Sequence, residues 1–131
     1  MIVVDAAAIV DYLLGREPGG SWVGDQLDRA RRPCAPHLLD FEVASALRRL
    51  VLARELSSER GRGALEDLRD LRVVRYPARR LLDAIWRLHD NLTAYDAAYV
   101  ALAEALDLPI VTTDERLARS TGHTAEILTP A

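Results

Sequence analysis

The 131-residue chain contains no lysine, only one cysteine and no long uncharged apolar run. Because Cys34 has no partner in the chain, an internal disulfide is excluded, and the composition fits a reducing compartment. No stretch of about 18 uncharged apolar residues occurs, so no transmembrane helix is expected. Asp5 and the lack of a basic flank argue against an N-terminal signal peptide. A soluble cytoplasmic protein that does not bind membranes is therefore expected.

Because lysine is absent, all 17 basic side chains are arginine. One explanation is codon bias in a GC-rich genome; the other is selection for phosphate contacts, which the planar guanidinium makes well. Residues 48–80 hold ten Arg and five acids, whereas residues 81–131 hold three Arg and eight acids. Such an arginine-rich segment is typical of a solvated helix face, but it also matches a nucleic-acid footprint.

Half of the residues are hydrophobic, which excludes a disordered chain and predicts a packed core. No internal repeat, low-complexity segment or linker is present, so we expect one domain over residues 1–131. Short apolar runs alternate with helical periodicity. Strands are predicted at 2–4, 34–35, 72–76, 110–112 and 126–128, a loop at 15–20, and helices at 6–14, 21–31, 38–54, from 57, 78–89, 94–106 and from 114.

This alternation of strands and helices predicts a three-layer α/β/α sandwich with a central, mainly parallel sheet. Ligands of such sheets bind beyond the carboxyl ends of the strands. Four acids stand at such places: Asp5 and Asp114 follow strands, while Glu42 and Asp96 lie near the start of helices. The neighbours of Glu42 on its helix face are small, and those of Asp96 are apolar, so both acids are expected to point into one pocket.

Helix capping is the alternative explanation for these acids, because acids are favoured at helix N-termini. Thr93 and Asp96 fit a capping box, and Asp40 and Asp114 fit caps of the helices that they begin. A cap contributes only about 1 kcal/mol and needs no burial. Capping therefore does not explain why Asp5 stands between two apolar runs, or why Asp96 lies on the apolar side of its helix.

Four carboxylates in one pocket would repel one another strongly. At an effective dielectric constant near 20, two of them about 4 Å apart repel by about 4 kcal/mol. Either some acids hold protons or a cation neutralises them. Oxygen ligands suit Mg²⁺ or Mn²⁺ rather than Zn²⁺, and Mg²⁺ commonly recruits phosphate oxygens. An acid cluster beside an arginine-rich surface therefore predicts metal-assisted hydrolysis of phosphodiesters.

Four segments carry a family resemblance: VDAAAIVDYLL (4–14), PHLLDFEVASALRRL (36–50), LTAYDAAYVALAEAL (92–106) and LPIVTTDERLA (108–118). In this order they resemble the PIN-domain ribonucleases, and among these the VapC-type toxins of bacterial toxin–antitoxin pairs. The resemblance implies a PIN-like fold and RNA cleavage that depends on Mg²⁺, for which Mn²⁺ may substitute. It also implies a homodimer and inhibition by a cognate VapB-like antitoxin whose tail enters the active-site groove.

The same resemblance assigns roles to residues of this chain. The acids of the metal site are Asp5, Glu42, Asp96 and Asp114, and the hydroxyl residue two positions before the last acid is Thr112. In the expected reaction a metal-activated water attacks phosphorus, and no protein nucleophile is needed.

The sequence departs from the family pattern at two positions. Ala7 stands where many relatives carry Ser or Thr, and Arg116 stands where some carry another acid. Arg116 is expected either to contact phosphate or to point into solvent.

Two rival functions fit parts of the sequence. A phosphatase of the haloacid dehalogenase type also has an aspartate after its first strand, but it needs a second one where this chain has Ala7, and usually a lysine. The other rival is a degenerate PIN-like module that binds RNA or protein without catalysis. Which RNA would be cut stays open, since transfer, ribosomal and messenger RNA all fit.

Overall fold

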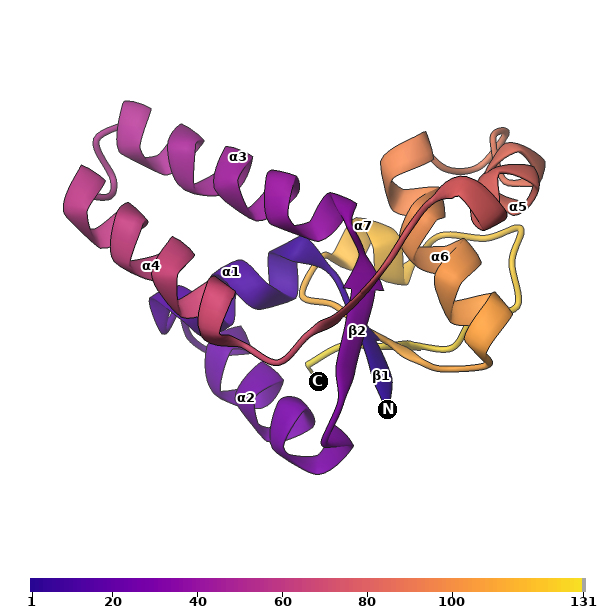
Figure 1. Cartoon of the computed structure of the whole chain (residues 1–131), viewed down its shortest axis with the longest axis horizontal. Helices are drawn as coiled ribbons and strands as arrows, with labels where there is room; N and C mark the ends of the chain where they lie inside the picture. Colours follow the sequence, from indigo (N-terminus) through magenta and orange to yellow (C-terminus); the bar gives the residue numbers. More distant parts are fainter. Residues whose placement is uncertain (131) are drawn as a thin grey trace.

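A parallel sheet of five strands forms the centre of the fold in the computed structural model, which describes residues 1–130 (Figure 1). The strands are β1 (Ile2–Val4), β2 (Pro33–Pro36), β3 (Val74–Tyr76), β4 (Ile110–Val111) and β5 (Ile127–Leu128). Their order is β3-β2-β1-β4-β5, and every neighbouring pair is parallel. All three residues of β1 are buried, as expected for a central strand covered on both faces.

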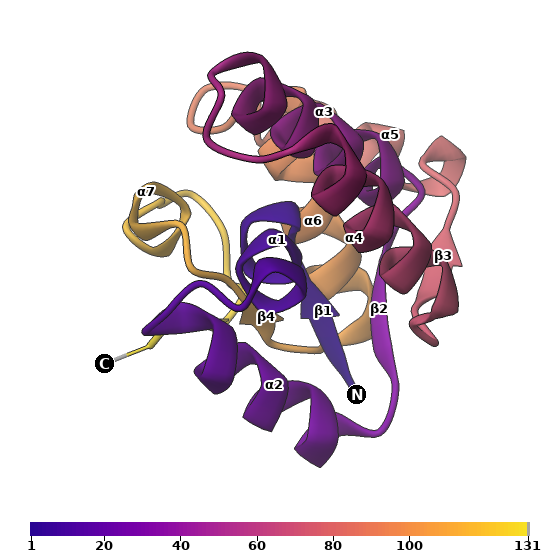
Figure 2. The ribbon, with the colours of Figure 1, turned by 90° about the vertical axis from the view of Figure 1, so that its left-hand side faces the viewer.

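Helices cover both faces of this sheet. They are α1 (Ala6–Leu14), α2 (Gly19–Ala30), α3 (Leu38–Leu52), α4 (Ser58–Asp70), α5 (Leu82–Arg87), α6 (Ala94–Leu106) and α7 (Glu115–Ala118), with a 3₁₀ turn at Arg79–Leu81. Helix α1 packs against α2, α3 and α4, and α3 packs against α4. Helix α6 packs against β1, β2 and β4, and α5 packs on α6 (Figure 2). The predicted three-layer α/β/α sandwich is therefore confirmed.

Several element boundaries differ from the prediction for identifiable reasons. The predicted loop at 15–20 is shorter, because α2 already begins at Gly19. A Cβ atom on Gly20 would stand 2.7 Å from the carbonyl oxygen of Asp11, so this glycine serves close packing of α2 on α1. The predicted helix 38–54 ends at Leu52, because Arg54 has a positive φ of 60°. The predicted helix 78–89 is the 3₁₀ turn followed by α5.

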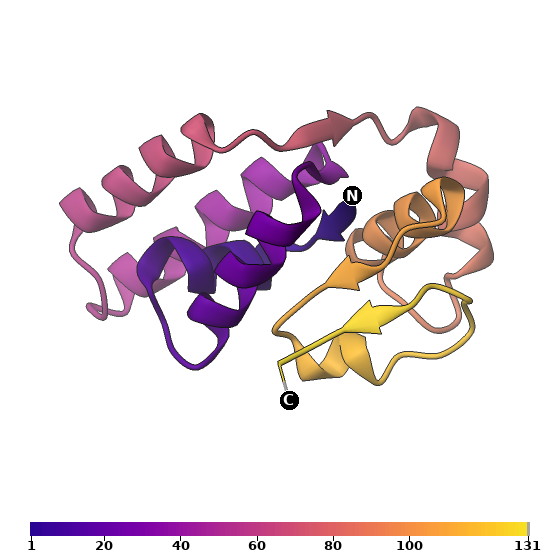
Figure 3. The same ribbon diagram turned by 90° about the horizontal axis from the view of Figure 1, so that it is seen from below.

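Helix α6 places the candidate site relative to the sheet. Its residues 97–103 are all buried, and four of these seven are alanines, which allow the helix to approach the strands closely. Its N-terminus therefore lies at the same edge of the sheet as the carboxyl ends of β1 and β4. The strands β4 and β5 pair beside α7, which brings the segment after β4 to that edge as well (Figure 3).

Within residues 1–130, no helix is both long enough and apolar enough to cross a bilayer.

Candidate active site

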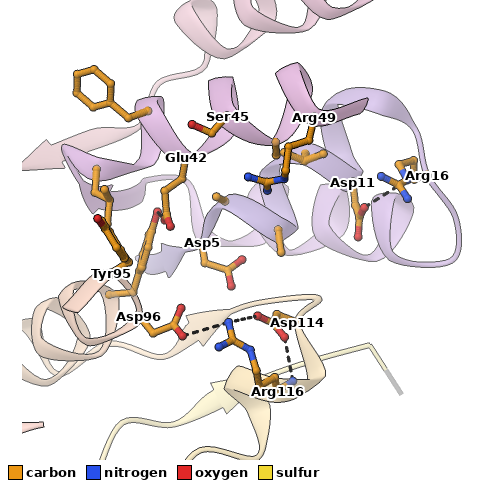
Figure 4. A pocket seen from close by; sticks show the side chains of 17 residues that line it. Asp5, Asp11, Arg16, Glu42, Ser45, Arg49, Tyr95, Asp96, Asp114 and Arg116 are labelled. Carbon is orange, nitrogen blue, oxygen red and sulfur yellow. Dashed lines mark hydrogen bonds and ion pairs between the residues drawn. The ribbon is translucent and has the colours of Figure 1, made fainter. Parts of the chain in front are cut away.

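A cavity of about 580 Å³ opens where β1 and β4 end, between α1, α3, α6 and the start of α7. The four acids singled out from the sequence all line it: Asp5, Glu42, Asp96 and Asp114 (Figure 4). They come from four segments spread over more than a hundred positions of the chain. The fold thus brings the predicted acids to one cavity, at the edge of the sheet where a ligand was expected.

Asp5 is the most buried of these acids, with 5% of its surface exposed. Its Oδ1 accepts a hydrogen bond of 2.9 Å from the backbone N–H of Ala8, which caps α1, and its Oδ2 accepts one from the Thr112 hydroxyl. Burial raises the pKa of Asp5 to about 7, although both hydrogen bonds oppose the shift; the charges of Asp114 and Glu42 raise it further. Near neutral pH, this carboxylate is therefore poised between its two protonation states.

Thr112 connects the first and the last acid. Its side chain is fully buried, and its Oγ1 donates to Asp5 and accepts a 2.9 Å hydrogen bond from the backbone N–H of Asp114. Asp114 in turn caps α7, because its Oδ1 accepts from the backbone N–H of Arg116 at 2.9 Å. The capping predicted for Asp114 is thus observed together with its place in the cavity. One side chain performs both tasks.

Glu42 projects from α3 on the opposite wall of the cavity. Its Oε1 accepts a 2.7 Å hydrogen bond from the hydroxyl of Tyr99. Burial raises the pKa of Glu42, as does the nearby charge of Asp96, while the Tyr99 hydrogen bond and the Arg49 charge lower it. Sequence reasoning missed Tyr99 as a residue of the site. Its spacing of three residues from Asp96 is the available signal, since residues so spaced are neighbours on a helix.

Removing the Tyr99 hydroxyl tests this pairing. The variant Tyr99→Phe should lower the free energy of unfolding by about 1 to 2 kcal/mol at pH 8, because the acceptor is a charged carboxylate. The loss should be smaller at pH 4, where Glu42 is protonated and accepts more weakly. Urea denaturation at both pH values measures it. Tyr95→Phe is the control, since the Tyr95 hydroxyl makes no hydrogen bond within residues 1–130, and a loss of equal size there would contradict the assignment.

Asp96 binds an arginine instead of completing the predicted capping box. Thr93 does cap α6, because its Oγ1 accepts from the backbone N–H of Asp96 at 3.2 Å. The Asp96 carboxylate, however, turns into the cavity and lies 3.2 Å from the guanidinium of Arg116, which also lies 3.3 Å from Asp114 (Figure 4). Arg116 therefore bridges two of the acids instead of pointing freely into solvent.

The chemistry of the cavity fits a divalent cation, although the ligands are not drawn together. Carboxylate oxygens are the donors that Mg²⁺ and Mn²⁺ prefer, and a cationic group already bridges two of them. Within the described residues 1–130, no three His, Cys, Asp or Glu side chains stand close enough to hold a metal ion as they lie. Bringing Asp96 and Asp114 onto one ion would require the guanidinium between them to move.

Asp40 also differs from the sequence interpretation. It does not cap α3; its carboxylate forms two hydrogen bonds of 2.8 Å with the guanidinium of Arg75 in β3, and so links the helix to the sheet.

The rim of the cavity carries two aromatic side chains, Phe41 and Tyr95, which are 74% and 61% exposed. Sequence reasoning missed Phe41, since a lone aromatic residue next to an acid has no distinctive spacing. Ala7 also lines the cavity and contributes no hydroxyl there.

The sequence of this chain is similar to those of several known proteins. The family model of the PIN domain matches residues 2–122. Ribonuclease VapC1 of Mycobacterium tuberculosis is 49% identical over 126 residues, covering 95% of this chain and 94% of that protein. The VapC ribonuclease Mb0985 of Mycobacterium bovis is 49% identical over 117 residues, covering 89% and 88%. Ribonuclease VapC12 of Mycobacterium tuberculosis is 39% identical and covers 97% of both chains.

The fold also resembles a solved structure. The crystal structure of PAE2754 from Pyrobaculum aerophilum superposes with a TM-score of 0.67 and covers 96% of this chain and 82% of that chain. At 23% sequence identity, this likeness speaks for the fold alone.

Proposed function

Since this chain belongs to the PIN-domain family, we propose that it is an endoribonuclease, the toxin of a toxin–antitoxin pair. Relatives named as VapC ribonucleases match over nearly its whole length, which supports this activity. The single observation that carries the proposal is the gathering of four carboxylates, contributed by distant segments, around one open cavity at the carboxyl edge of the sheet. Helix capping alone would not require that convergence.

The four acids would divide the work of holding a divalent ion. Asp5, Asp96 and Asp114 would bind it directly or through water, while Glu42 on the opposite wall would hold a second ion or orient the attacking water. Thr112 would keep Asp5 and Asp114 in fixed relation through its two hydrogen bonds. The ion, which we infer to be Mg²⁺ with Mn²⁺ as a substitute, would lower the pKa of a water and offset the charge developing on the phosphate.

The substrate would be held by side chains around the cavity. Arg16 and Arg49 line it and offer guanidinium groups to the phosphates that flank the cleaved bond. The exposed rings of Phe41 and Tyr95 at the rim suit stacking on unpaired bases, which are the usual targets of RNA recognition outside helices. This arrangement favours a single-stranded or looped RNA segment.

The toxin assignment brings further partners into the proposal. A cognate VapB-like antitoxin and a second copy of the chain are inferred from the family, and a cytoplasmic location follows from the RNA substrate. The whole chain, residues 1–131, would act as one nuclease domain.

Metal-dependent cleavage is the direct test of the proposed function. Purified chain is incubated with labelled RNA in Mn²⁺, in Mg²⁺ and in EDTA, and the products are resolved by gel electrophoresis. Cleavage in either metal that stops in EDTA is expected, because the four carboxylates have no positive charge with which to offset the charge developing on the phosphate. Equal cleavage in EDTA would rule out the metal mechanism. RNA binding without cleavage would instead identify a degenerate binding module.

A further inference from the structure

The position of Arg116 between two of the acids has a consequence for metal binding. The same guanidinium nitrogen, Nη2, lies 3.2 Å from Oδ2 of Asp96 and 3.3 Å from Oδ2 of Asp114. These acids belong to different elements, since Asp96 is in the first turn of α6 and Asp114 caps α7. The positive charge of Arg116 is thus shared by two separate walls of the cavity.

A divalent ion held by both acids would need the same space. Mg²⁺ binds carboxylate oxygens at about 2.0 to 2.1 Å, so an ion ligated by Asp96 and Asp114 would lie between their oxygens. A nitrogen almost equally distant from those two oxygens already stands there. Both cations cannot occupy that point together, so a metal ion ligated through these two oxygens would have to displace the guanidinium.

The local structure holds Arg116 in this place. Its backbone N–H donates to Oδ1 of Asp114 at 2.9 Å, so the capping interaction that starts α7 also sets where the side chain begins. The charges of Asp96 and then Asp114 raise the pKa of Arg116, in keeping with a cation stabilised by both acids.

We propose that Arg116 is an internal counter-ion that competes with the divalent metal ion for Asp96 and Asp114. This inference rests on the proposed function, because it takes the cavity to be a metal site. Without metal, the guanidinium relieves the repulsion between the two acids. When metal enters, the guanidinium is displaced, and Arg116 lowers the apparent metal affinity of the site.

The expected size of the effect follows from the exposure of Arg116. Its side chain is 68% exposed, and an exposed ion pair contributes little individually. Two such pairs lost together correspond to about a three- to tenfold change in metal affinity. The variant Arg116→Gln should therefore reach half-saturation with Mn²⁺ at a concentration about three- to tenfold lower than the wild type.

The test is a Mn²⁺ titration of the purified full chain, followed by the shift of its thermal unfolding midpoint, with no RNA present. Arg116→Gln is compared with the wild type and with Arg49→Gln. Arg49 lines the same cavity, but within residues 1–130 it forms no ion pair with either acid. It therefore controls for the loss of one positive charge, and its half-saturation should stay within about twofold of the wild type. Arg116→Lys keeps the positive charge on a shorter side chain. Its half-saturation concentration of Mn²⁺ should lie between those of the wild type and Arg116→Gln.

The possible outcomes separate this inference from the proposed function. If wild type and Arg116→Gln respond to Mn²⁺ at the same concentration, the competition is refuted while the metal site stands. If Arg49→Gln shifts as much as Arg116→Gln, the effect comes from the overall charge and not from the bridging contacts, which also refutes it. If no form responds at millimolar Mn²⁺, the metal site and the competition fail together.

Discussion

Asp96→Asn lowers metal-dependent RNA cleavage by at least about 100-fold. Loss of a side chain that only hydrogen-bonds to a metal ligand already costs about 10- to 100-fold, and Asp96 is proposed to bind the ion directly or through water. The substitution keeps the size of the side chain and the backbone hydrogen bond to Thr93, so α6 retains its cap. It removes the negative charge that faces the cavity and balances Arg116. The initial rate of cleavage in saturating Mn²⁺, compared with the wild type under the same conditions, measures the loss.

The same helix offers a matched control for this variant. Asp107 ends α6 with a left-handed backbone (φ 54°), a conformation that Asn adopts readily. Asp107→Asn therefore makes the identical chemical change at the far end of α6 without straining the chain. It should cleave RNA at the wild-type rate. Cleavage by Asp96→Asn at that same rate would show that Asp96 is a helix-terminus acid and no part of the catalytic site.

The positions of the acids could be predicted because patterns among nearby residues indicate the strands and helices that hold them. The helix at 94–106 has both a capping threonine and a run of small apolar residues, and it forms with the predicted bounds. Asp5 could be recognised because it stands between two apolar runs, where a side chain is expected to be buried. In a parallel sheet the first residues after the strands lie at one edge, so predicting the strands was enough to predict where the acids lie.

Pairings between distant residues were not accessible in the same way. Asp40 was expected to cap a helix, but its partner Arg75 lies 35 positions further along the chain, and no periodicity connects the two. The bridge from Arg116 to Asp96 likewise depends on how α7 is placed against α6. Helix α2 began earlier than expected because its glycines serve close packing, which composition alone does not distinguish from a loop.

The burial of Asp5 links the stability of the chain to its proposed activity. Asp5 has an ordinary pKa of 3.8 when exposed, as in the unfolded chain, and burial raises it to about 7 in the folded protein. For an acid with a raised pKa, the folded state binds the proton more tightly than the unfolded state. Its contribution to stability is therefore greatest below about pH 4, falls as the pH rises towards 7, and is constant above that. A metal ion that binds the ionised carboxylate would offset this cost.

The variant Asp5→Asn should separate these two effects. Without metal at pH 8, it should be more stable than the wild type by about 2 to 4 kcal/mol, since about 1.4 kcal/mol accompanies each pKa unit. Asn caps helices as well as Asp does, so the bond to the N–H of Ala8 can be kept. The gain should shrink at pH 5 and in Mn²⁺, and RNA cleavage should fall at least about 100-fold because a metal ligand is lost.

Urea denaturation in EDTA at pH 5 and pH 8 measures the difference between Asp5→Asn and the wild type, so that pH effects common to both proteins cancel. Asp11→Asn is the control: Asp11 lines the same cavity but is more exposed and pairs with Arg16 at 3.8 Å. Its effect should stay within about 1 kcal/mol at both pH values. An Asp5→Asn protein less stable than the wild type at pH 8 would mean that the buried carboxylate stabilises the fold by itself. Asp5 would then have a structural role, and its burial would no longer imply that a cation is needed to neutralise it.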